Sequence, residues 1–379
     1  MSNPLEPKDL PKQEQEAKPG IRQMMPWFGP EEEQAVSNYM RSGGWLTEFD
    51  KTREFEDLIS RYVGAKHCVV VSNGTVSLIV TMIALGLKPR DEVLVPDFTQ
   101  VASGNSVIPT GAKPIIVDID RNDLCMDLGL AQKKLNSNTK AVVAVSLNGR
   151  CPRINEFVEF ARQHSLYLIE DAAQSLGSRV EGKHLGTFGD VGSFSFSTPK
   201  IISTGQGGAL VTNNSHLDEL FRKIKDFGRA ESGVDKHVTL GYNFKFTDLQ
   251  AVVGLEQMKK LPWRVKRKER MYEIYRELLQ SIPQVKFIQT DTKETPPWFM
   301  DILCEKREGL IKYLSERGVG TRPFYPPLHT QMPFATRSQG EFPVSKEISG
   351  RGLWLPSSSF LTDDQIRFVC SEIRHYYAS

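Results

Sequence analysis

Short apolar runs alternate with longer amphipathic stretches along this chain from about residue 28 onwards. The short runs predict strands, and apolar positions that recur every three or four residues predict helices. In one such helix, residues 52–63, the apolar side chains of Phe55, Leu58, Ile59 and Tyr62 fall on one face. The predicted strands are 68–71, 92–95, 113–118, 141–145 and 166–170, and the predicted helices are 31–41, 52–63, 76–85, 128–135 and 154–164. Strands that alternate with crossover helices predict an α/β fold around a mostly parallel sheet.

The pattern changes after residue 190. Residues 191–196 and 209–212 predict two strands with a short connection, so antiparallel pairing there would make the sheet mixed. Residues 247–281 predict one or two long helices with a break at Pro262. A strand near 298–304, a helix near 307–317, a Pro-rich segment and a helix from Thr362 follow. We therefore predict a large domain over residues 26–260 and a smaller α+β domain over 261–379.

Residues 1–25 are rich in Pro, Lys, Glu and Gln, which predicts a flexible tail. The whole chain has 379 residues, a length that suits two domains. Its 48 Lys and Arg and 46 Asp and Glu give a net charge of +2, which argues against a nucleic-acid binder with a basic face.

No apolar run is long enough for a transmembrane helix, and the N-terminus carries no apolar signal segment. The five cysteines are scattered without a CxxC pair, which favours neither a disulfide framework nor a metal site. We therefore expect a cytoplasmic protein without membrane contact.

Three segments that follow predicted strands carry candidate chemistry, because ligands of open α/β sheets collect beyond the carboxyl ends of the strands. The first is SNGTVS, residues 72–77, which follows one strand and opens a helix. Backbone N–H groups at such a helix start can bind a phosphate. The alternative is an ordinary helix cap by Asn73 or Thr75.

The second segment is LYLIEDAAQ, residues 166–174, in which Asp171 follows an apolar strand. A buried carboxylate is costly without a cationic partner, and a protonated pyridine nitrogen is one suitable partner. A carboxylate in that place would keep the ring of pyridoxal phosphate an electron sink. The small Ala173 would leave room for a flat ring, and Gln174 could donate to a ring oxygen. The alternatives for Asp171 are a structural ion pair or a helix cap.

The third segment, residues 193–208, reads SFSFSTPKIISTGQGG and places Lys200 in a turn that three glycines follow. Lys200 is a candidate Schiff-base residue if burial and neighbouring charge lower its pKa. Most lysines are simply solvated, which is the alternative. The glycine run does not read GxGxxG, so it gives little support to a dinucleotide site.

Together these segments resemble the DegT/DnrJ/EryC1/StrS sugar aminotransferases, which are fold-type-I enzymes that depend on pyridoxal phosphate. The resemblance runs from about Phe28 to the end and is densest at SNGT, EDAAQSLGS, GSFSFSTPK and TGQGGALVTNN. The C-terminal half, including GYNFKFTDLQAVVGLEQMKKL, TRPFYPPLH and LPSSSFLTDDQI, looks most like the GDP-perosamine synthase branch. The resemblance implies an aspartate-aminotransferase-like fold and a homodimer with shared active sites.

The resemblance also implies roles for residues of this chain. Lys200 would be the catalytic lysine, and its presence favours transamination, since some relatives carry His there and act as 3-dehydratases. Asp171 would pair with the pyridine nitrogen. The other cofactor-binding residues that the resemblance implies are Gly74, Thr75 and Ser195 at the phosphate, Gln174 at the ring oxygen and Asn243 from the partner subunit. Ala173 is predicted beside the ring because of its small size.

The chain departs from the family pattern at two places. Gln100, in TQVAS, stands where the family usually stacks an aromatic residue on the cofactor ring, so it would lie on the ring or contact substrate. Arg150, in LNGR, would contact a nucleotide diphosphate or be only a surface residue. The candidate substrate-binding residues are Trp45, Arg322, Tyr325 and His329, of which Trp45 and His329 also have simple structural readings.

The expected reaction transfers the amino group of L-glutamate, through pyridoxamine phosphate, to a nucleotide-linked 4-keto-6-deoxyhexose. The first choice of acceptor is GDP-4-keto-6-deoxymannose, giving GDP-perosamine for a surface polysaccharide such as lipopolysaccharide O-antigen. The same chemistry on a UDP- or dTDP-linked keto hexose, a keto-octulosonate or a keto-inositol is the alternative. A non-catalytic sugar-nucleotide-binding homologue and a nicotinamide oxidoreductase are less favoured, the latter because no GxGxxG loop follows the first strand.

Overall fold

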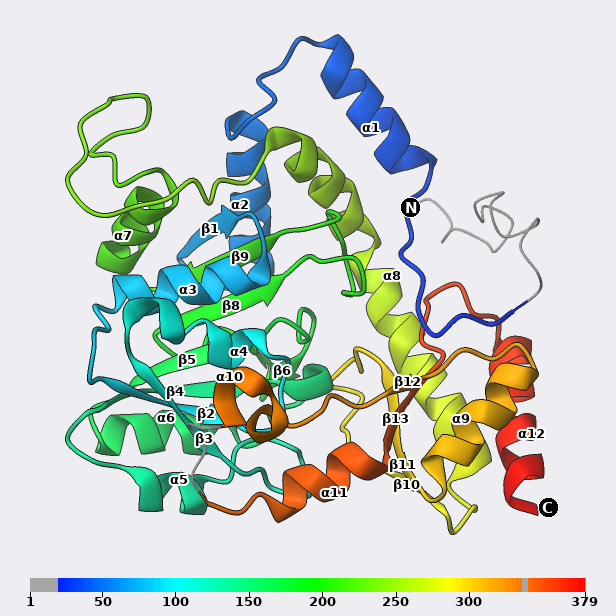
Figure 1. Cartoon of the computed structure of the whole chain (residues 1–379). Coiled ribbons are helices and arrows are strands. Elements are labelled where there is room, and N and C mark those ends of the chain that lie inside the picture. Colours follow the sequence, from blue (N-terminus) through cyan, green and yellow to red (C-terminus); the bar gives the residue numbers. More distant parts are fainter. Residues whose placement is uncertain (1–19, 336–339, 379) are drawn as a thin grey trace.

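A seven-stranded sheet forms the centre of the molecule in the computed structural model, which describes residues 20–335 and 340–378 (Figure 1). The strand order is β1-β9-β8-β5-β4-β2-β3. In that order the strands are β1 (His67–Val71), β9 (Gly208–Thr212), β8 (Val191–Ser195), β5 (Tyr167–Asp171), β4 (Thr139–Val145), β2 (Glu92–Pro96) and β3 (Lys113–Val117). Their mostly apolar residues are buried on both faces, as a parallel sheet between two helical layers requires.

The sheet is mixed, which confirms the prediction from the short connection after residue 196. Strands β8, β5, β4, β2 and β3 pair in parallel, whereas β9 is antiparallel to both β8 and β1. The carboxyl ends of β8, β5, β4 and β2 therefore lie at one edge of the sheet. The candidate segments around Asp171 and Lys200 follow two of these strands.

Helices cover both faces of the sheet (Figure 1). One layer packs α3 (Gly74–Ala84) and α7 (Ser215–Lys225) against β1, β9 and their neighbours. The other layer holds α2 (Asp50–Val63), α5 (Leu128–Lys134), α6 (Ile154–Gln163) and the first half of α8 (Asp248–Leu279). The short α4 (Ala102–Asn105) follows β2, and α1 (Pro30–Arg41) packs on α8. Helix α7 was not predicted from the sequence.

A second, smaller sheet follows α8. Its strand order is β10-β11-β13-β12 and every pair is antiparallel. The strands are β10 (Val285–Phe287), β11 (Met300–Cys304), β13 (Gly352–Leu355) and β12 (Arg322–Pro323). One buried cluster joins β11 and β13 to α9 (Arg307–Glu316), α12 (Asp363–Ala378) and the second half of α8, while α11 (Pro343–Arg351) precedes β13. This sheet fits the small α+β unit expected at the C-terminus.

Helix α8 links the two sheets without interruption. It runs for 32 residues with Pro262 inside it, so the predicted break at Pro262 is wrong. The helix is held on both sides of the proline by buried contacts with α1, α2 and α12, which stabilise it against the lost hydrogen bond. We keep the domain division at residues 260 and 261 as a proposal; it falls within this shared helix.

The chain is already ordered before residue 25. The Ile21 N–H donates to the Gly318 carbonyl at 2.7 Å, and the Ser357 N–H donates to the Gln23 carbonyl at 2.7 Å. The prediction of a flexible tail over residues 1–25 is therefore wrong for residues 20–25, because these backbone hydrogen bonds hold them against the small unit. The rest of the predicted tail, residues 1–19, lies outside the described residues. Among the described helices, none is long and apolar enough to cross a membrane.

Candidate active site

A cavity of about 290 Å³ opens at the carboxyl ends of the parallel strands and the start of α3. Its lining brings together most of the residues predicted for the cofactor, together with two of the predicted substrate residues. Those of the predicted set that line it are Gly74, Thr75, Gln100, Asp171, Ala173, Gln174, Ser195, Lys200, Arg322 and Tyr325. The strands end here because each apolar run stops at a polar residue, and the sheet brings those ends to one edge.

The start of α3 forms one corner of the cavity. Asn73 is the helix cap, since its Oδ1 accepts the Val76 N–H at 2.9 Å, so Asn73 and not Thr75 has the capping role. Gly74 and Thr75 are the first helical residues, whose N–H groups have no acceptor within the helix. A side chain at position 74 would lie 2.8 Å from the Ser195 Cβ, so the absence of one leaves room between α3 and β8. This corner has the shape and donors of an anion cradle.

Asp171 is buried at the end of β5. Its carboxylate accepts the Ser103 hydroxyl at 2.6 Å and the Ala173 N–H at 3.2 Å, and Ser103 is bonded to Thr99 at 2.8 Å. Burial raises the pKa of the carboxyl group, and the Ser103 hydrogen bond and the charge of Lys200 oppose that rise. Among the described residues, no Lys, Arg or His nitrogen lies within ion-pair distance of Asp171, so the reading as a structural ion pair is wrong. The buried charge faces the cavity instead.

Lys200 lies opposite, in the loop between β8 and β9. It is half-buried, and its Nζ lies 4.4 Å from the centre of the Trp298 ring. Burial and the charge of Arg322 lower the pKa of Lys200 to about 8, against the opposing effect of Asp171. A pKa near 8 leaves about a tenth of the amine neutral at pH 7, far more than for an ordinary lysine, as suits a nucleophilic or proton-transferring role. Since its Nζ lies over the buried Trp298 ring at the cavity wall, Lys200 is not an ordinary solvated lysine.

Two glutamines line the cavity, and the side-chain oxygen of each already accepts a hydrogen bond from a backbone N–H. Gln174 Oε1 accepts the Asn148 N–H at 2.6 Å, and Gln100 Oε1 accepts the Ala102 N–H at 2.6 Å. Each side chain therefore keeps its amide NH₂ group for another acceptor. Gln100 is exposed at the cavity rim, and a ring-stacking or a substrate-contacting position stays a prediction.

Arg322 and Tyr325 line the side of the cavity that the small unit contributes. The Arg322 guanidinium lies 5.5 Å from the ring centres of both Tyr325 and Trp354. Burial raises the pKa of Tyr325 to about 12, so its hydroxyl stays a hydrogen-bond donor. A cation and a phenol at the mouth suit an anionic, hydroxyl-rich ligand.

The cavity lining of this chain does not include three of the predicted residues. His329 is tied to the buried Asp97, whose Oδ2 lies 2.7 Å from the His329 Nδ1, and its ring stacks on Phe342 at 4.6 Å. Asn243 is exposed and bridges to Asp226 through its backbone. Trp45 is 66% exposed. Their predicted contacts with substrate or with a partner's cofactor stay predictions.

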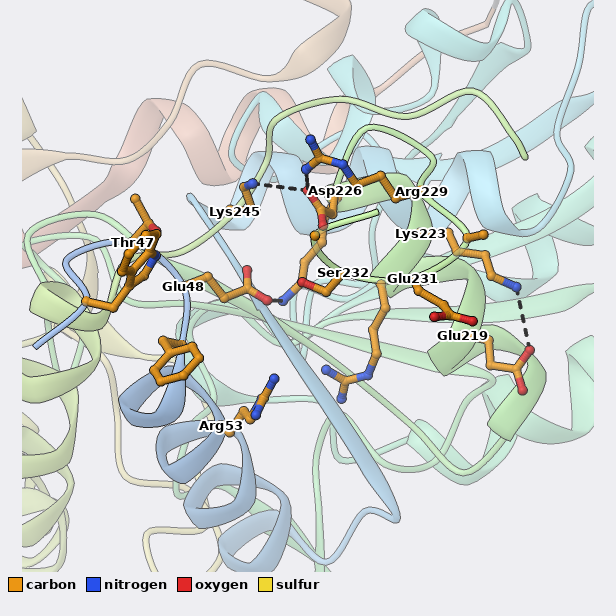
Figure 2. Close-up of a pocket in the computed structure, with 16 residues that line it drawn as sticks. Thr47, Glu48, Arg53, Glu219, Lys223, Asp226, Arg229, Glu231, Ser232 and Lys245 are labelled. Carbon is orange, nitrogen blue, oxygen red and sulfur yellow. Dashed lines mark hydrogen bonds and ion pairs between the residues drawn. The ribbon is translucent and has the colours of Figure 1, made fainter. Parts of the chain in front are cut away.

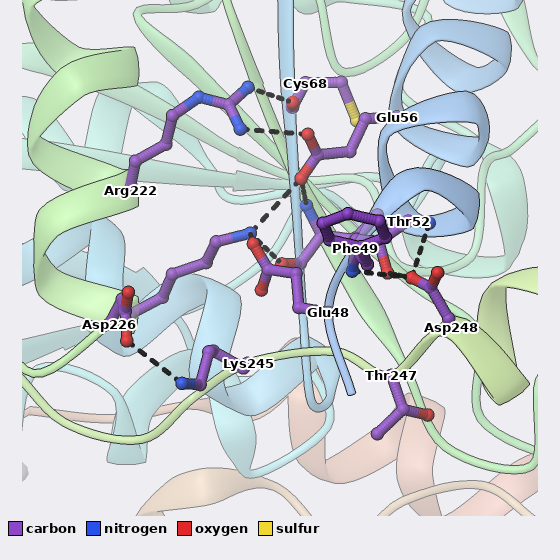
Figure 3. Close-up of polar contacts among 12 residues, drawn as sticks. Glu48, Phe49, Thr52, Glu56, Cys68, Arg222, Asp226, Lys245, Thr247 and Asp248 are labelled. Atoms are coloured by element: carbon purple, nitrogen blue, oxygen red, sulfur yellow. Dashed lines mark hydrogen bonds and ion pairs between the residues drawn. The ribbon is translucent and has the colours of Figure 1, made fainter. Parts of the chain in front are cut away.

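Trp45 instead lines a second and larger cavity of about 950 Å³ between α2, α7 and the segment before α8 (Figure 2). Its charged walls are mutually paired: Asp226 binds Arg229 at 2.8 Å and Lys245 at 3.0 Å. Lys225, which is buried and also lines this cavity, lies 2.8 Å from Glu48 and 3.3 Å from Glu56 (Figure 3). This cavity therefore offers little unpaired charge to a ligand.

Arg150 lies neither on the surface nor beside the cavity, where it was predicted to contact a nucleotide diphosphate. It is buried, and it forms a two-pronged ion pair with Asp301 of β11 at 2.5 and 3.1 Å. Its partner lies 151 residues further on, so no local pattern indicated the pair. Arg150 is a structural link between the two sheets and does not contact the cavity described above.

Sequence reasoning missed Trp298, Thr99 and Ser103. Trp298 lines the cavity and contacts Lys200, while Thr99 and Ser103 form the hydrogen-bonded pair behind Asp171. Thr99 and Ser103 lie in the segment TQVAS, whose position after β2 placed it at the same sheet edge. Trp298 comes from the small unit, and nothing in the local sequence indicated that contact.

Comparisons with known proteins agree with this geometry. The model of the DegT/DnrJ/EryC1/StrS aminotransferase family matches residues 27–374. GDP-perosamine synthase of Vibrio cholerae is 34% identical over 93% of this chain and 99% of that protein, and the enzyme of Escherichia coli O157:H7 is 35% identical over 86% and 90%. The crystal structure of the aminotransferase TlmJ from Streptoalloteichus hindustanus superposes with a TM-score of 0.90 at 29% identity, covering 94% of this chain and 99% of that one.

Proposed function

The chain belongs to the DegT/DnrJ/EryC1/StrS family of pyridoxal-phosphate-dependent sugar aminotransferases, and from this premise we propose that it makes GDP-perosamine. The amino donor is L-glutamate, and the acceptor is the 4-keto carbon of GDP-4-keto-6-deoxymannose. The observation that carries the proposal is similarity over nearly the whole length to two GDP-perosamine synthases, together with a lysine at position 200. The product would serve a surface polysaccharide.

The residues of the cavity fit the cofactor. Gly74, Thr75 and Ser195 would hold its phosphate in the corner where Gly74 leaves room beside Ser195. Asp171, a buried carboxylate without an ion-pair partner in the described chain, would hold the protonated pyridine nitrogen, and the free NH₂ of Gln174 would donate to the ring oxygen. When bound, the cofactor supplies an electron sink that makes the proton on the reacting carbon acidic.

Lys200 would move that proton. Its lowered pKa allows the Nζ to accept a proton as a neutral amine and return it as an ammonium group near neutral pH. Asp171 keeps the amine protonatable, since its negative charge opposes the effect of burial on Lys200. Arg322 and Tyr325, at the mouth, would bind the diphosphate and a sugar hydroxyl of the substrate.

A homodimer is part of the proposal. Two segments, residues 40–49 and 227–242, carry nine of the thirteen large apolar side chains that the described residues leave exposed. Trp45 and Phe49 of the first segment and residues 229–233 of the second line the second cavity, and we propose that the exposed side chains of the two segments form one apolar surface beside it. Burying this surface against a second copy would bring Asn243 and Trp45 toward the partner's active site.

The proposal is tested by supplying GDP-, dTDP- and UDP-linked 4-keto-6-deoxyhexoses in turn with L-glutamate and analysing the products by mass spectrometry. We expect an amino sugar from the GDP-linked substrate, with 2-oxoglutarate formed in equal amount. Turnover of only the dTDP- or UDP-linked sugar would contradict the assigned acceptor. Lys200→Ala should form no product, whereas Lys286→Ala, which removes an exposed lysine of β10, should behave as the natural chain.

A further inference from the structure

Trp298 is the residue of the small unit that reaches Lys200. The residue is 3% exposed, and one face of its ring lies 4.4 Å from the Lys200 Nζ. Its indole Nε1–H donates to the carbonyl of Pro199, the residue immediately before Lys200, at 2.7 Å. One side chain therefore contacts both the ammonium group and the backbone that carries it.

The carbonyl on the other side of Lys200 is anchored as well. Arg264 of α8 donates from Nη1 to the Ile201 carbonyl at 2.6 Å. The two carbonyls that flank Lys200 are thus fixed by two elements distant in sequence. This leaves the loop little freedom to carry the Nζ away from the cavity.

Trp298 is itself held in place. Its carbonyl accepts the Nζ of the buried Lys268 at 2.8 Å, one helical turn beyond Arg264, and its N–H donates to the Asn148 carbonyl at 3.3 Å. Its ring stacks on Phe299 at 3.7 Å with an interplanar angle of 19°. Every polar group of Trp298 is used, so the ring has a fixed orientation toward Lys200.

We propose that Trp298 is the positioning residue for Lys200, with its indole face receiving the ammonium group and its indole N–H anchoring the lysine loop. The proposal rests on the assignment of Lys200 as the cofactor lysine, but not on which sugar is aminated. The negative face of an indole ring stabilises a nearby cation. The ring therefore favours the protonated form of Lys200 at the place where the proton is needed.

The other charged and titratable groups around Lys200 come from β5, from β12 and the segment after it, and from α8, which contributes Arg264 and Lys268. Asp171 at the end of β5 favours the ammonium, Arg322 of β12 disfavours it, and the Tyr325 hydroxyl, whose pKa burial raises to about 12, stays neutral. Lys268 lies behind Trp298 and faces the Trp298 carbonyl. A test must therefore change the ring without moving any of these groups.

Fluorinated tryptophans placed only at position 298 meet that requirement, because ring fluorination weakens the negative face with little change of shape. The pH dependence of Lys200 modification by an amine-reactive reagent, followed by mass spectrometry on the cofactor-free full chain, gives its pKa. We expect this pKa to fall stepwise from none to three fluorines, by about half a unit to one unit in total. The same fluorinated tryptophans placed at position 263 should leave the pKa of Lys200 unchanged, since Trp263 is half-buried and contacts Trp27.

The indole N–H is tested separately with Trp298→Phe, which keeps a ring and removes the donor. Hydrogen exchange of the peptide that contains residues 197–203 should become faster in this variant and stay unchanged in the fluorinated series. An unchanged Lys200 pKa across the fluorinated series, or an equal shift from position 263, would overturn the proposal. Since the labelling uses neither sugar nor glutamate, these outcomes are distinct from a failure of the proposed reaction.

Discussion

The charge of Asp171 acts directly on Lys200 across the cavity. It raises the pKa of the lysine against burial and Arg322. In Asp171→Asn, we therefore expect the pKa of Lys200 to fall below its present value of about 8, which labelling at varied pH would measure. We also expect the rate of transamination to fall about 100-fold or more, because the variant would lose the carboxylate that we propose holds the protonated pyridine nitrogen of the cofactor.

Ser103→Ala is the matched control for Asp171→Asn. It removes the 2.6 Å hydrogen bond to Asp171 but keeps the carboxylate. The pKa of Lys200 should then change less than in Asp171→Asn. An Asp171→Asn variant with an unaltered Lys200 pKa would show that the two groups are not electrostatically coupled.

Single residues of the site were predictable where a motif follows a strand. Asp171 is the last residue of β5 and Lys200 follows the end of β8 by five residues, so the parallel pairing of these strands brings both to one edge, and the structure places both in one cavity. Arg150 was not predictable, because its partner Asp301 belongs to another unit. Trp298 escaped for the same reason. Sequence motifs identify site residues that lie close together in the chain. Contacts between residues of distant elements depend on how those elements pack, which a motif does not show.

At the scale of elements, α2 depends on a carboxylate that it does not contain. Asp248, the first residue of α8, accepts the backbone N–H groups of Phe49, Lys51 and Thr52 at 2.8, 3.0 and 2.9 Å, and the hydroxyl of Thr52 at 2.6 Å (Figure 3). The Tyr39 hydroxyl lies 2.9 Å away. This single side chain serves as the N-terminal cap of α2 and ties it to α8.

We expect Asp248→Ala to lower the free energy of unfolding by about 2–3 kcal/mol at pH 7, measured by urea denaturation, because three backbone N–H groups, one buried and two part-buried, lose their acceptor. Although burial raises the pKa of Asp248, these hydrogen bonds outweigh it and hold the pKa below its ordinary value. The carboxylate therefore stabilises the fold above the unfolded pKa of about 3.9, and this stabilisation is lost as the pH falls through the lower folded value.

The difference between the natural chain and Asp248→Ala should accordingly shrink in acid. Asp248→Asn keeps one acceptor oxygen and should lose less stability than Asp248→Ala. Equal stability of all three chains at pH 7 would contradict the capping role.

The alternating strands and helices of the large unit were predictable because apolar positions repeat with a different period in strands and in helices. The bounds in the structure agree with the predicted bounds to within a few residues. The long helix beginning near residue 247 was also predicted, but Pro262 was read as a break and the tertiary contacts of α8 override it. The two-residue strand β12 carries too little pattern to be seen in sequence. Helices α7 and α11 were missed.

At the scale of the whole molecule, the buried pair of Arg150 and Asp301 joins the large sheet to the small one. Arg150→Ala would leave Asp301 charged and uncompensated, so we expect a loss of about 3–5 kcal/mol in the free energy of unfolding. The double variant Arg150→Met with Asp301→Leu removes both charges and should recover most of that loss. A single variant as stable as the natural chain would show that water or another group compensates Asp301.

The apolar surface of residues 40–49 and 227–242 is the contact that we propose between two copies of the chain. The segment between α7 and α8 forms a long loop (Figure 1), part of which lines the second cavity, and Leu240 within it is 67% exposed. Leu240→Glu would place a charge in the proposed contact between two copies, and burial of an unpaired charge opposes association. We therefore expect sedimentation velocity to show a dimer for the natural chain and a monomer for this variant. Phe368→Glu, on α12 of the small unit and 43% exposed, should stay dimeric. If Leu240→Glu remains a dimer, this surface is not the interface, and Asn243 would have no route to a partner's site.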